Sequence, residues 1–302
     1  EAHGGGAVSA HGLIDASLVA EEVGRVVAPG PLVPVTVVAD ALSRGAPATV
    51  RDEVLPGLLD GSAVVAWTGP TPAAGRLDGD ALVLDGSVRP VEAGSTADHL
   101  LVTATVDGSP RLGLVAADAP GVRVTPLAGL DLVRRFATVD LDGARAEPIG
   151  GPDDVERALR VACVLQCAEV VGALERVVTM TVEYLGDRYS FGRPLASYQA
   201  LKHRVADDRV DVEACAATAA AAARAVATDA ADAGELVSVA KHWIGGRATE
   251  IVQDCVQLHG GIGVTWEHDL HLYLRRVTVD RASYGTPEDH AERVATAVLG
   301  VA

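Results

Sequence analysis

The stretch "EPIGGPDDV", residues 147–155, marks the point where this sequence changes from strand patterns to helix patterns. Upstream of it, from Ser62 to about Ile149, short β-branched runs such as "HLLVTATVDG" and "ATVDLDG" are separated by Gly, Asp and Pro turns. Runs of this kind, spaced by roughly eight to twelve residues, predict an antiparallel barrel or sandwich. Downstream of it, helical patterns continue almost to the end of the chain.

Three long helices are expected after this junction. Asp153 and Asp154 suit the first turn or cap of a helix from about Val155 to Arg188, because acidic groups favour the positive end of a helix dipole. A second helix is expected from about Ser197 through the alanine-rich "ATAAAAARAVATDAADAG", and a third over roughly Glu235 to His259. Alanine is the best helix former and lets helices approach closely, so these segments predict a packed bundle.

The residues before the strands also follow a helical pattern. Apolar side chains recur at helical spacing over residues 9–27, the proline-rich "APGPLVP" ends that helix, and a second helical stretch is expected from roughly Val35 to Leu59. The predicted domains are therefore a helical domain at 1–61, a strand domain at 62–150 and a helical bundle at 151–302.

Composition excludes several kinds of partner. The chain has 302 residues, is 49% hydrophobic and carries a formal net charge of -16 with a sequence pI of about 4.9. Binding to nucleic acid or to an anionic membrane needs a positive surface, so neither is expected. No apolar run reaches the roughly 18 residues that span a bilayer, and the start "EAHGGGAVSA" is unlike a signal peptide. We predict a cytoplasmic protein, and because the chain begins with Glu1 we expect that some N-terminal sequence is missing.

The cysteines and histidines do not predict a metal site. The four cysteines contain no C-x-x-C pair, and Cys163 and Cys167 are spaced as neighbours on a helix, which favours buried thiols over a disulfide or a metal site. The segment "WEHDLHLY" holds His268 and His271, but it lacks the H-E-x-x-H order and a distant third ligand.

Two connections between helices are more specific. In "DRYSFGRPLASYQ" a helix ends at Arg188 and the next begins near Ser197, which taken alone is an ordinary helix–helix turn. In "QDCVQLHGGIGVTWE" three glycines follow a helix end, which taken alone is a glycine cap. Glycines also leave backbone N–H groups open to a flat or phosphorylated ligand.

Taken together, these features resemble the acyl-CoA dehydrogenase family over nearly the whole chain. The resemblance rests on R-x-x-F-G from Arg188, a Gln eight residues after Phe191, Q-x-x-G-G-x-G from Gln257, and the Gly285-Thr286 turn, all behind a strand-rich domain. It implies an α+β multidomain fold with truncated N-terminal helices, a middle antiparallel β-domain and a C-terminal four-helix bundle.

The resemblance also implies a cofactor and its contacts. Members of the family bind FAD across a subunit interface: one subunit holds the isoalloxazine ring against its strand domain, and the neighbour's bundle contacts the pyrophosphate and adenosine. The positions that match these neighbour contacts are Arg188, Ser190, Phe191, Gln199, Gln257, Gly260 and Gly261. A guanidinium suits a pyrophosphate because it forms charge-assisted hydrogen bonds.

The other half of the family's site differs in this sequence. Beside the flavin ring the family usually has Trp-Ile-Thr or Trp-Ile-Ser, whereas this chain has Pro90-Val91-Glu92. The family's Thr-Glu-Pro segment with its downstream Gly-Ser-Asp is reduced to "WTGPTPAAG", Trp67 to Gly75. We therefore expect that this chain cannot hold a flavin ring of its own.

The catalytic base of the family is also missing. The usual Glu directly before the Gly-Thr turn is replaced by Tyr284, and the alternative Glu position on the preceding long helix is Ala162. A phenol with a reference pKa near 10 is a poor substitute for a carboxylate at neutral pH. We interpret Tyr284 as a wall residue.

The chain thus resembles the smaller, non-catalytic subunit of the α2β2 acyl-CoA dehydrogenases that actinobacteria use on steroid side chains. The resemblance implies a catalytic partner subunit that binds the acyl-CoA substrate, FAD at the mixed interface, and an electron-transfer flavoprotein as electron acceptor. Two alternatives stay open: a self-sufficient flavoenzyme with a displaced base such as Glu92 or Glu169, and a scaffold protein that kept the fold without flavin.

Overall fold

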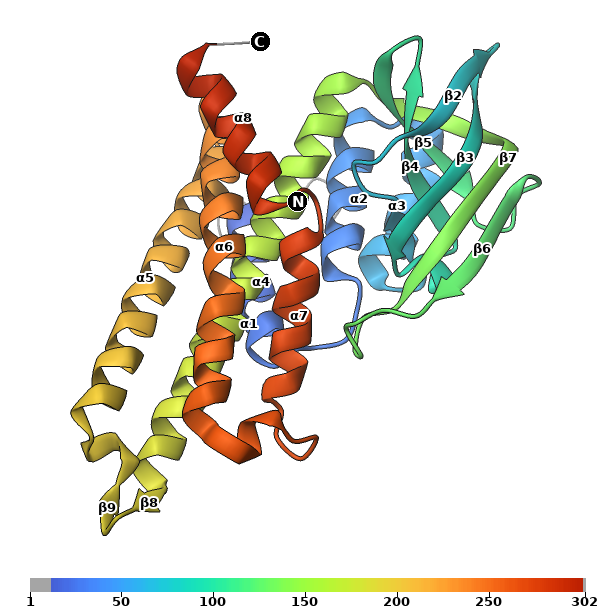
Figure 1. Ribbon diagram of the computed structural model, residues 1–302. Helices are drawn as coiled ribbons and strands as arrows, with labels where there is room; N and C mark the ends of the chain where they lie inside the picture. The colour runs from blue at the N-terminus through green and yellow to red at the C-terminus, as the bar shows by residue number, and fades with distance from the viewer. Residues whose placement is uncertain (1–11, 301–302) are drawn as a thin grey trace. The chain divides into compact units, whose positions relative to one another are not determined.

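The computed structural model describes residues 12–300, which form two compact units. Among the described residues, the first unit comprises 29–162 and the second comprises 12–28 together with 163–300. The longest helix, α4 (Pro152–Asp187), begins in the first unit and continues into the second (Figure 1).

The first unit is a strand domain preceded by two helices. Its elements are α2 (Leu32–Gly45), α3 (Ala48–Asp60), β1 (Val65–Trp67), β2 (Ala73–Asp78), β3 (Ala81–Glu92), η1 (Gly94–Thr96), β4 (His99–Val106), β5 (Ser109–Ala116), β6 (Val122–Leu127) and β7 (Phe136–Gly150). The strands pair in the order β1-β4-β2-β3-β7-β5, and a further β4–β5 pairing closes the sheet into a barrel, with β6 added beside β7.

Most of these strand pairs are antiparallel, as the turn spacing predicted. The β4–β5 hairpin turns at Asp107 and Gly108, which both have positive φ, the conformation that an Asp-Gly hairpin turn requires. Two pairings differ from the expectation, because β1 and β2 both lie parallel to β4. Parallel pairs join strands that are distant in sequence, so local patterns do not reveal them.

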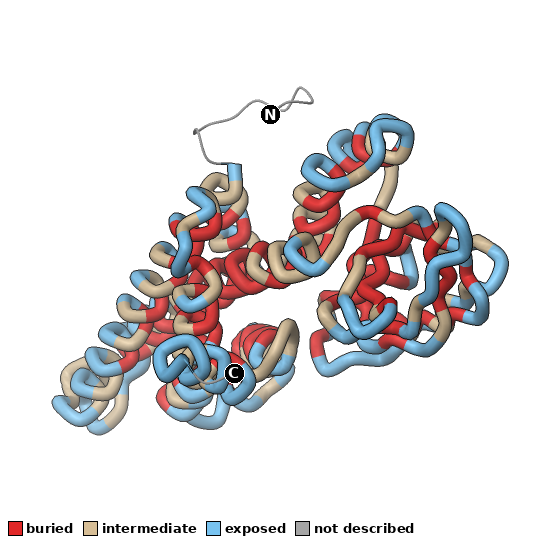
Figure 2. The backbone as a smooth tube through the Cα atoms, turned by 90° about the horizontal axis from the view of Figure 1, so that it is seen from above, coloured by how far each residue is buried: buried red, intermediate tan, exposed pale blue. Residues whose placement is uncertain are grey.

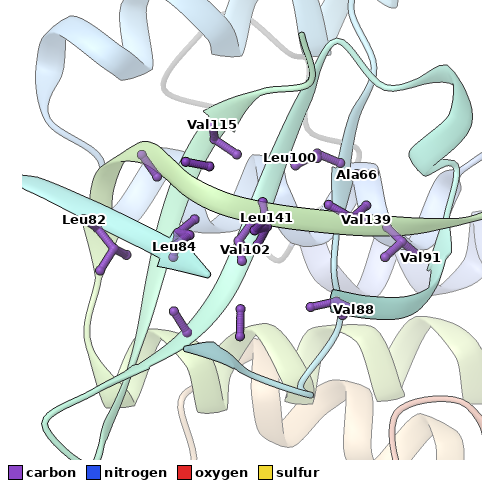
Figure 3. Close-up of a cluster of buried hydrophobic side chains, with 14 of the residues drawn as sticks. Ala66, Leu82, Leu84, Val88, Val91, Leu100, Val102, Val115, Val139 and Leu141 are labelled. Carbon is purple, nitrogen blue, oxygen red and sulfur yellow. The ribbon is translucent and has the colours of Figure 1, made fainter. Parts of the chain in front are cut away.

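The barrel interior is filled by aliphatic side chains from every part of the sheet. Figure 3 shows residues that alternate along the strands converging on one cluster. Leu84, Leu100 and Val139 are fully excluded from solvent there. Burying each such side chain stabilises the folded state by about 1.5–3 kcal/mol.

One predicted helical stretch is interrupted. The stretch expected to be helical from Val35 to Leu59 is two helices, because α2 ends at Gly45 and α3 begins at Ala48. Ala46 is extended, with φ -71° and ψ 143°. The residue before a proline is pushed out of the helical region, so Pro47 explains the break.

The second unit is a bundle of long helices. Its elements are α1 (Gly12–Arg25), the rest of α4, β8 (Tyr189–Ser190), β9 (Arg193–Pro194), η2 (Leu195–Ser197), α5 (Gln199–Ala227), α6 (Ala233–His259), η3 (Gly260–Val264), α7 (Leu270–Ala282) and α8 (Pro287–Leu299). Figure 1 shows α4, α5, α6 and α7 running alongside one another, and in Figure 2 the buried positions follow the inner sides of the helices. Helices α4 and α6 start and end within a few residues of the predicted positions, and α4 begins with Asp153 and Asp154 in its first turn. Helix α5 ends at Ala227, earlier than the predicted end at Gly234, because the chain turns there before α6 begins at Ala233.

Helix α1 packs against α4 at a backbone-to-backbone crossing. A Cβ on Gly24 would collide with the carbonyl of Glu169, and a Cβ on Gly172 would collide with the carbonyl of Glu21. Each helix therefore offers a glycine to the other's backbone, and the second unit includes α1 for this reason.

Candidate functional site

The predicted residues around Arg188 lie on an exposed hairpin between α4 and α5. Phe191 is 95% exposed and has φ 50°, and Arg188 and Gln199 are also exposed. The hairpin is stabilised by a hydrogen bond in which the Tyr198 hydroxyl donates to the carbonyl of Ser190 at 2.9 Å. A large aromatic residue is therefore exposed to solvent while its backbone lies in the left-handed region, which is uncommon for a bulky side chain.

The predicted residues around Gln257 lie at the end of α6. Gly260 has φ 64° and ψ -138°, a conformation open mainly to glycine. Gly261 does not have a positive φ, and a Cβ placed on it would meet nothing within 4 Å among the described residues. Among the described residues, no neighbouring atom restricts position 261 to glycine.

The structure brings these two connections to the same end of the bundle. Tyr184, one turn before Arg188, stacks on His259 with ring centroids 4.5 Å apart. His259 is 2% exposed, and burial lowers its pKa below the usual 6.5. The stack joins the end of α4 to the end of α6, so the hairpin and the glycine turn are neighbours.

The sequence reasoning missed the aromatic groups behind the glycine turn. His268 meets His259 edge-on at 4.6 Å between centroids, and Trp266 meets His271 at 4.7 Å. Within residues 12–300 no group of three His, Cys, Asp or Glu residues is arranged to hold a metal ion. His268 and His271 instead pack as rings, and aromatic packing of this kind leaves no sequence signature.

Tyr284 lies in the turn between α7 and α8, at φ 60°. The backbone of this turn is fixed on its α8 side: Thr286 and Asp289 form a reciprocal capping box at the start of α8. His290 Nε2 lies 3.0 Å from the carbonyl of Tyr284 and Nδ1 lies 3.2 Å from Ser238 Oγ. A carbonyl can only accept, so Nε2 donates and Nδ1 accepts, and burial lowers the pKa of His290, which favours this neutral form.

The α7 side of the same turn is held by a buried lysine. Lys241, on α6, is 3% exposed. Its ammonium donates to the carbonyls of Asp280 and Ser283 at 3.0 and 2.8 Å and to Gln166 Oε1 at 2.5 Å. The last carbonyls of a helix have no partner inside the helix, and here Lys241 supplies one from another helix.

The structure also locates the residues considered as displaced bases. Glu169 pairs with Arg276 in the bundle interior, where the two side chains are 2% and 1% exposed. Glu92 pairs with Arg134 at 3.3 Å in the strand unit, with 11% and 4% exposed. Each of the two carboxylates therefore forms an ion pair with an arginine. Ala162, the alternative position of the family's Glu, is fully buried in α4.

The segment that begins at Trp67, one of the two expected to depart from the family pattern, is held by internal hydrogen bonds. Trp67 Nε1 donates to Thr103 Oγ1 at 3.0 Å, and that hydroxyl donates to the carbonyl of Gly69 at 2.7 Å. Thr68 Oγ1 accepts from the amide of Thr103 at 3.2 Å. Trp67, Thr68 and Thr103 are 2%, 3% and 1% exposed.

A closed strand barrel and a bundle of long helices, with an arginine–phenylalanine hairpin beside a glycine turn, match the pattern that the sequence predicted for an acyl-CoA dehydrogenase. The chain belongs to the acyl-CoA dehydrogenase family. Residues 150–299 match the family model "Acyl-CoA dehydrogenase, C-terminal domain". The acyl-CoA dehydrogenase IpdE2 of Mycobacterium tuberculosis is 34% identical over 95% of this chain and 78% of its own length. IpdE2 of Mycolicibacterium smegmatis is 29% identical over 95% of this chain and 79% of its own length.

Two of the solved structures with similar folds carry titles that name two proteins each. A variant of the Tcur3481-Tcur3483 steroid ACAD superposes with a TM-score of 0.90 at 30% identity, over 95% of this chain and 81% of the other. The ChsE4-ChsE5 complex from Mycobacterium tuberculosis superposes with a TM-score of 0.90 at 28% identity, over 96% and 81%. The predicted fold class is thereby confirmed.

The structure also bears on the cysteines and on membrane-spanning helices. Cys163 and Cys167 are buried, as their helical spacing indicated, and Cys215 and Cys255 are buried as well. Burial raises the pKa of the Cys215 and Cys255 thiols to about 12. Among the helices of residues 12–300, none is long and apolar enough to cross a membrane.

Proposed function

We propose that this chain is the non-catalytic, FAD-completing subunit of a heteromeric acyl-CoA dehydrogenase. The proposal is supported by Tyr284, which the resemblance aligns with the family's catalytic Glu, in a turn whose backbone is held by Lys241, His290 and the capping box. In the proposed assembly this chain keeps the turn without the carboxylate, and the base comes from another chain.

The residues at the end of the bundle fit the pyrophosphate and adenosine of FAD. Arg188 offers an exposed guanidinium for a phosphate, and Gly260 and Gly261 leave open space above their backbone. Ser190, Phe191, Gln199 and Gln257 surround the same end of the unit. When bound, FAD supplies the acceptor for the hydride that leaves the β-carbon of the acyl-CoA.

The substrate class and the partners follow from the relatives. Two structures similar to this chain are named as a steroid ACAD and as a two-protein complex. We propose a steroid side-chain CoA thioester as the substrate, bound in the catalytic partner of an α2β2 heterotetramer. An electron-transfer flavoprotein is the proposed electron acceptor, and the cytoplasm is the proposed location.

The alternative of a self-sufficient enzyme with a displaced base has less support. Glu92 and Glu169, the two carboxylates considered for that role, are both buried against arginines. The alternative of a flavin-free scaffold gives no reason for an exposed Phe191 at positive φ or for a glycine at 261.

The test is to express the chain alone and together with a full-length acyl-CoA dehydrogenase subunit encoded beside it. We expect a colourless or insoluble product from the chain alone, and a yellow, active complex with one FAD per heterodimer from the pair. A yellow, active homotetramer of this chain alone would contradict the proposal, and the absence of flavin in both preparations would favour the scaffold.

A further inference from the structure

The residues that follow the glycine turn expose large apolar side chains. Ile262, Val264 and Trp266 are 44%, 77% and 69% exposed. Single exposed apolar residues are ordinary on a protein surface, whereas a group of them on one short stretch is typical of a surface that contacts another molecule. We call residues 262–266 the Trp266 segment.

The backbone of the Trp266 segment is fixed against α6. The carbonyl of Ile262 accepts from the amide of Thr265 at 3.1 Å and from its hydroxyl at 2.8 Å. Gly263 is buried, and a Cβ placed on it would collide with the carbonyl of Val256 on α6. The segment is therefore held on its inner side, while its three large apolar side chains remain exposed.

The Trp266 ring is held by two side chains of α7. His271 meets the ring edge-on, with 4.7 Å between the ring centroids and 64° between the planes. The guanidinium carbon of Arg275, one turn further along α7, lies 5.2 Å from the centroid of the Trp266 ring, which is within the range of a cation–π contact. These contacts reduce the freedom that the ring would lose on binding. Tryptophan and arginine are also enriched at the positions that dominate the energy of protein interfaces.

The Trp266 segment adjoins the proposed cofactor contacts without being one of them. It follows Gly260 and Gly261 directly, and His268, two residues after Trp266, meets His259 edge-on at 4.6 Å. The proposed function puts both FAD and the catalytic subunit at this end of the bundle. The pyrophosphate of FAD is charged and suits Arg188, whereas an apolar segment suits an apolar protein surface.

We infer that Trp266 is an anchor residue for the catalytic partner subunit, and that it binds this protein independently of FAD. The inference rests on the proposed function, which supplies the partner. The matching surface on the partner is an apolar pocket that takes the indole ring. The end of the bundle then has two separable parts, because Arg188 and the glycine turn contact the cofactor and the Trp266 segment contacts the partner protein.

The test measures how readily the co-expressed heteromeric complex dissociates, by sedimentation velocity over a dilution series. We expect Trp266→Ala to raise the dissociation constant about thirtyfold or more, and Trp266→Phe, which keeps an aromatic ring, to raise it less. Leu18→Ala is the matched control, because Leu18 on α1 is 59% exposed in the same unit, and it should dissociate like the wild type. The unfolding temperature of each variant shows whether it is folded.

FAD content separates the two parts of the surface. At concentrations where Trp266→Ala is assembled we expect one FAD per heterodimer, whereas Arg188→Ala assembles and loses FAD. A Trp266→Ala complex that dissociates like the wild type would overturn the inference, as would an equal loss in Leu18→Ala. A Trp266→Ala complex that assembles normally but loses FAD would also overturn it, because the ring would then contact the cofactor. The proposed function fails on a different result, the absence of any heteromeric complex from the wild type.

Cross-linking covers the case in which Trp266→Ala does not fold. Trp266→p-benzoylphenylalanine keeps an aromatic group at this position and makes it photoreactive, and mass spectrometry of the irradiated complex identifies the chain that it joins. We expect cross-links to the catalytic partner subunit, and none from Leu18→p-benzoylphenylalanine. Cross-links from position 266 to a second copy of this chain, or to no other chain, would reject the anchor.

Discussion

Tyr284 combines a left-handed backbone with a side chain that, in the proposed function, stands in place of the family's base. Its φ of 60° is uncommon for a large residue, and the surrounding turn, not the side chain, determines it. Because a phenol with a reference pKa near 10 stays protonated at neutral pH, Tyr284→Phe should leave the turnover of the complex within about twofold. A steady-state assay checks this, and a large loss of kcat would show that the hydroxyl takes part in the reaction.

Asp208 predicts a dependence of stability on pH. Burial, followed by the charge of Asp254, raises the pKa of Asp208 from 3.8 to about 7. The folded state then binds a proton that the unfolded chain releases, so this group's stabilising contribution is present below about pH 4 and is lost as the pH rises to about 7. Asp208→Asn should remove that loss and raise the unfolding temperature by a few degrees at pH 8, with little change at pH 4.

The neighbouring Asp207 provides the control for this prediction. Asp207 is exposed on the same helix, α5, so Asp207→Asn should leave the pH dependence of the unfolding temperature unchanged. Equal pH profiles for the wild type and Asp208→Asn would contradict the account.

At the scale of helices, the α1–α4 crossing makes a sharp prediction. Gly172→Ala would place a methyl group against the carbonyl of Glu21, so α1 must move away from α4, and we expect a loss of roughly 2 kcal/mol or more in the free energy of unfolding. Gly186→Ala is the matched control on the same helix, because a Cβ there meets nothing within 4 Å. Alanine is the better helix former, so the control should stabilise by about 0.5–1 kcal/mol. Denaturant unfolding measures both, and similar values for the two variants would contradict the crossing.

Lys241 links α6 to α4 and to the end of α7, so replacing it should destabilise the turn between α7 and α8. Lys241→Met leaves the carbonyls of Asp280 and Ser283 and the side chain of Gln166 without this donor, so we expect a loss of about 2–4 kcal/mol. The chain has one other lysine, Lys202, which is exposed on α5, and Lys202→Met should change stability by less than about 0.5 kcal/mol. Faster hydrogen exchange around the α7–α8 turn in Lys241→Met alone would support the role.

Some of these features could be predicted from the sequence, and others could not. The division into strands and long helices, the acidic start of α4 and the positions of the hairpin and glycine turn were predictable, because periodicity and turn residues are local signals. The parallel β1–β4 and β2–β4 pairs and the ion pairs Glu92–Arg134 and Glu169–Arg276 were not. They join residues that are distant in sequence, and only the folded chain brings them together.

At the scale of the whole molecule, the end of the bundle exposes its predicted site residues, whereas the strand unit directs the polar groups of its corresponding segments inward. The hairpin and the glycine turn present Arg188, Phe191 and an open backbone to the outside. The segments at Trp67 and Glu92 direct polar groups inward, to Thr103 and Arg134. This contrast is what the proposed function expects of a chain that contributes contacts to a cofactor site on a second, different chain.

The most direct test of this account is the FAD content of the co-purified complex when Arg188 is replaced. Arg188→Ala removes the proposed guanidinium–phosphate contact, so we expect a complex that still assembles but loses most of its FAD on gel filtration, while Tyr284→Phe keeps one FAD per heterodimer. Arg193→Ala, on the same hairpin, is the matched control, because Arg193 packs over the Tyr198 ring at 3.9 Å. A complex of Arg188→Ala that retains the full wild-type FAD content would contradict the claim that this chain completes its partner's cofactor site.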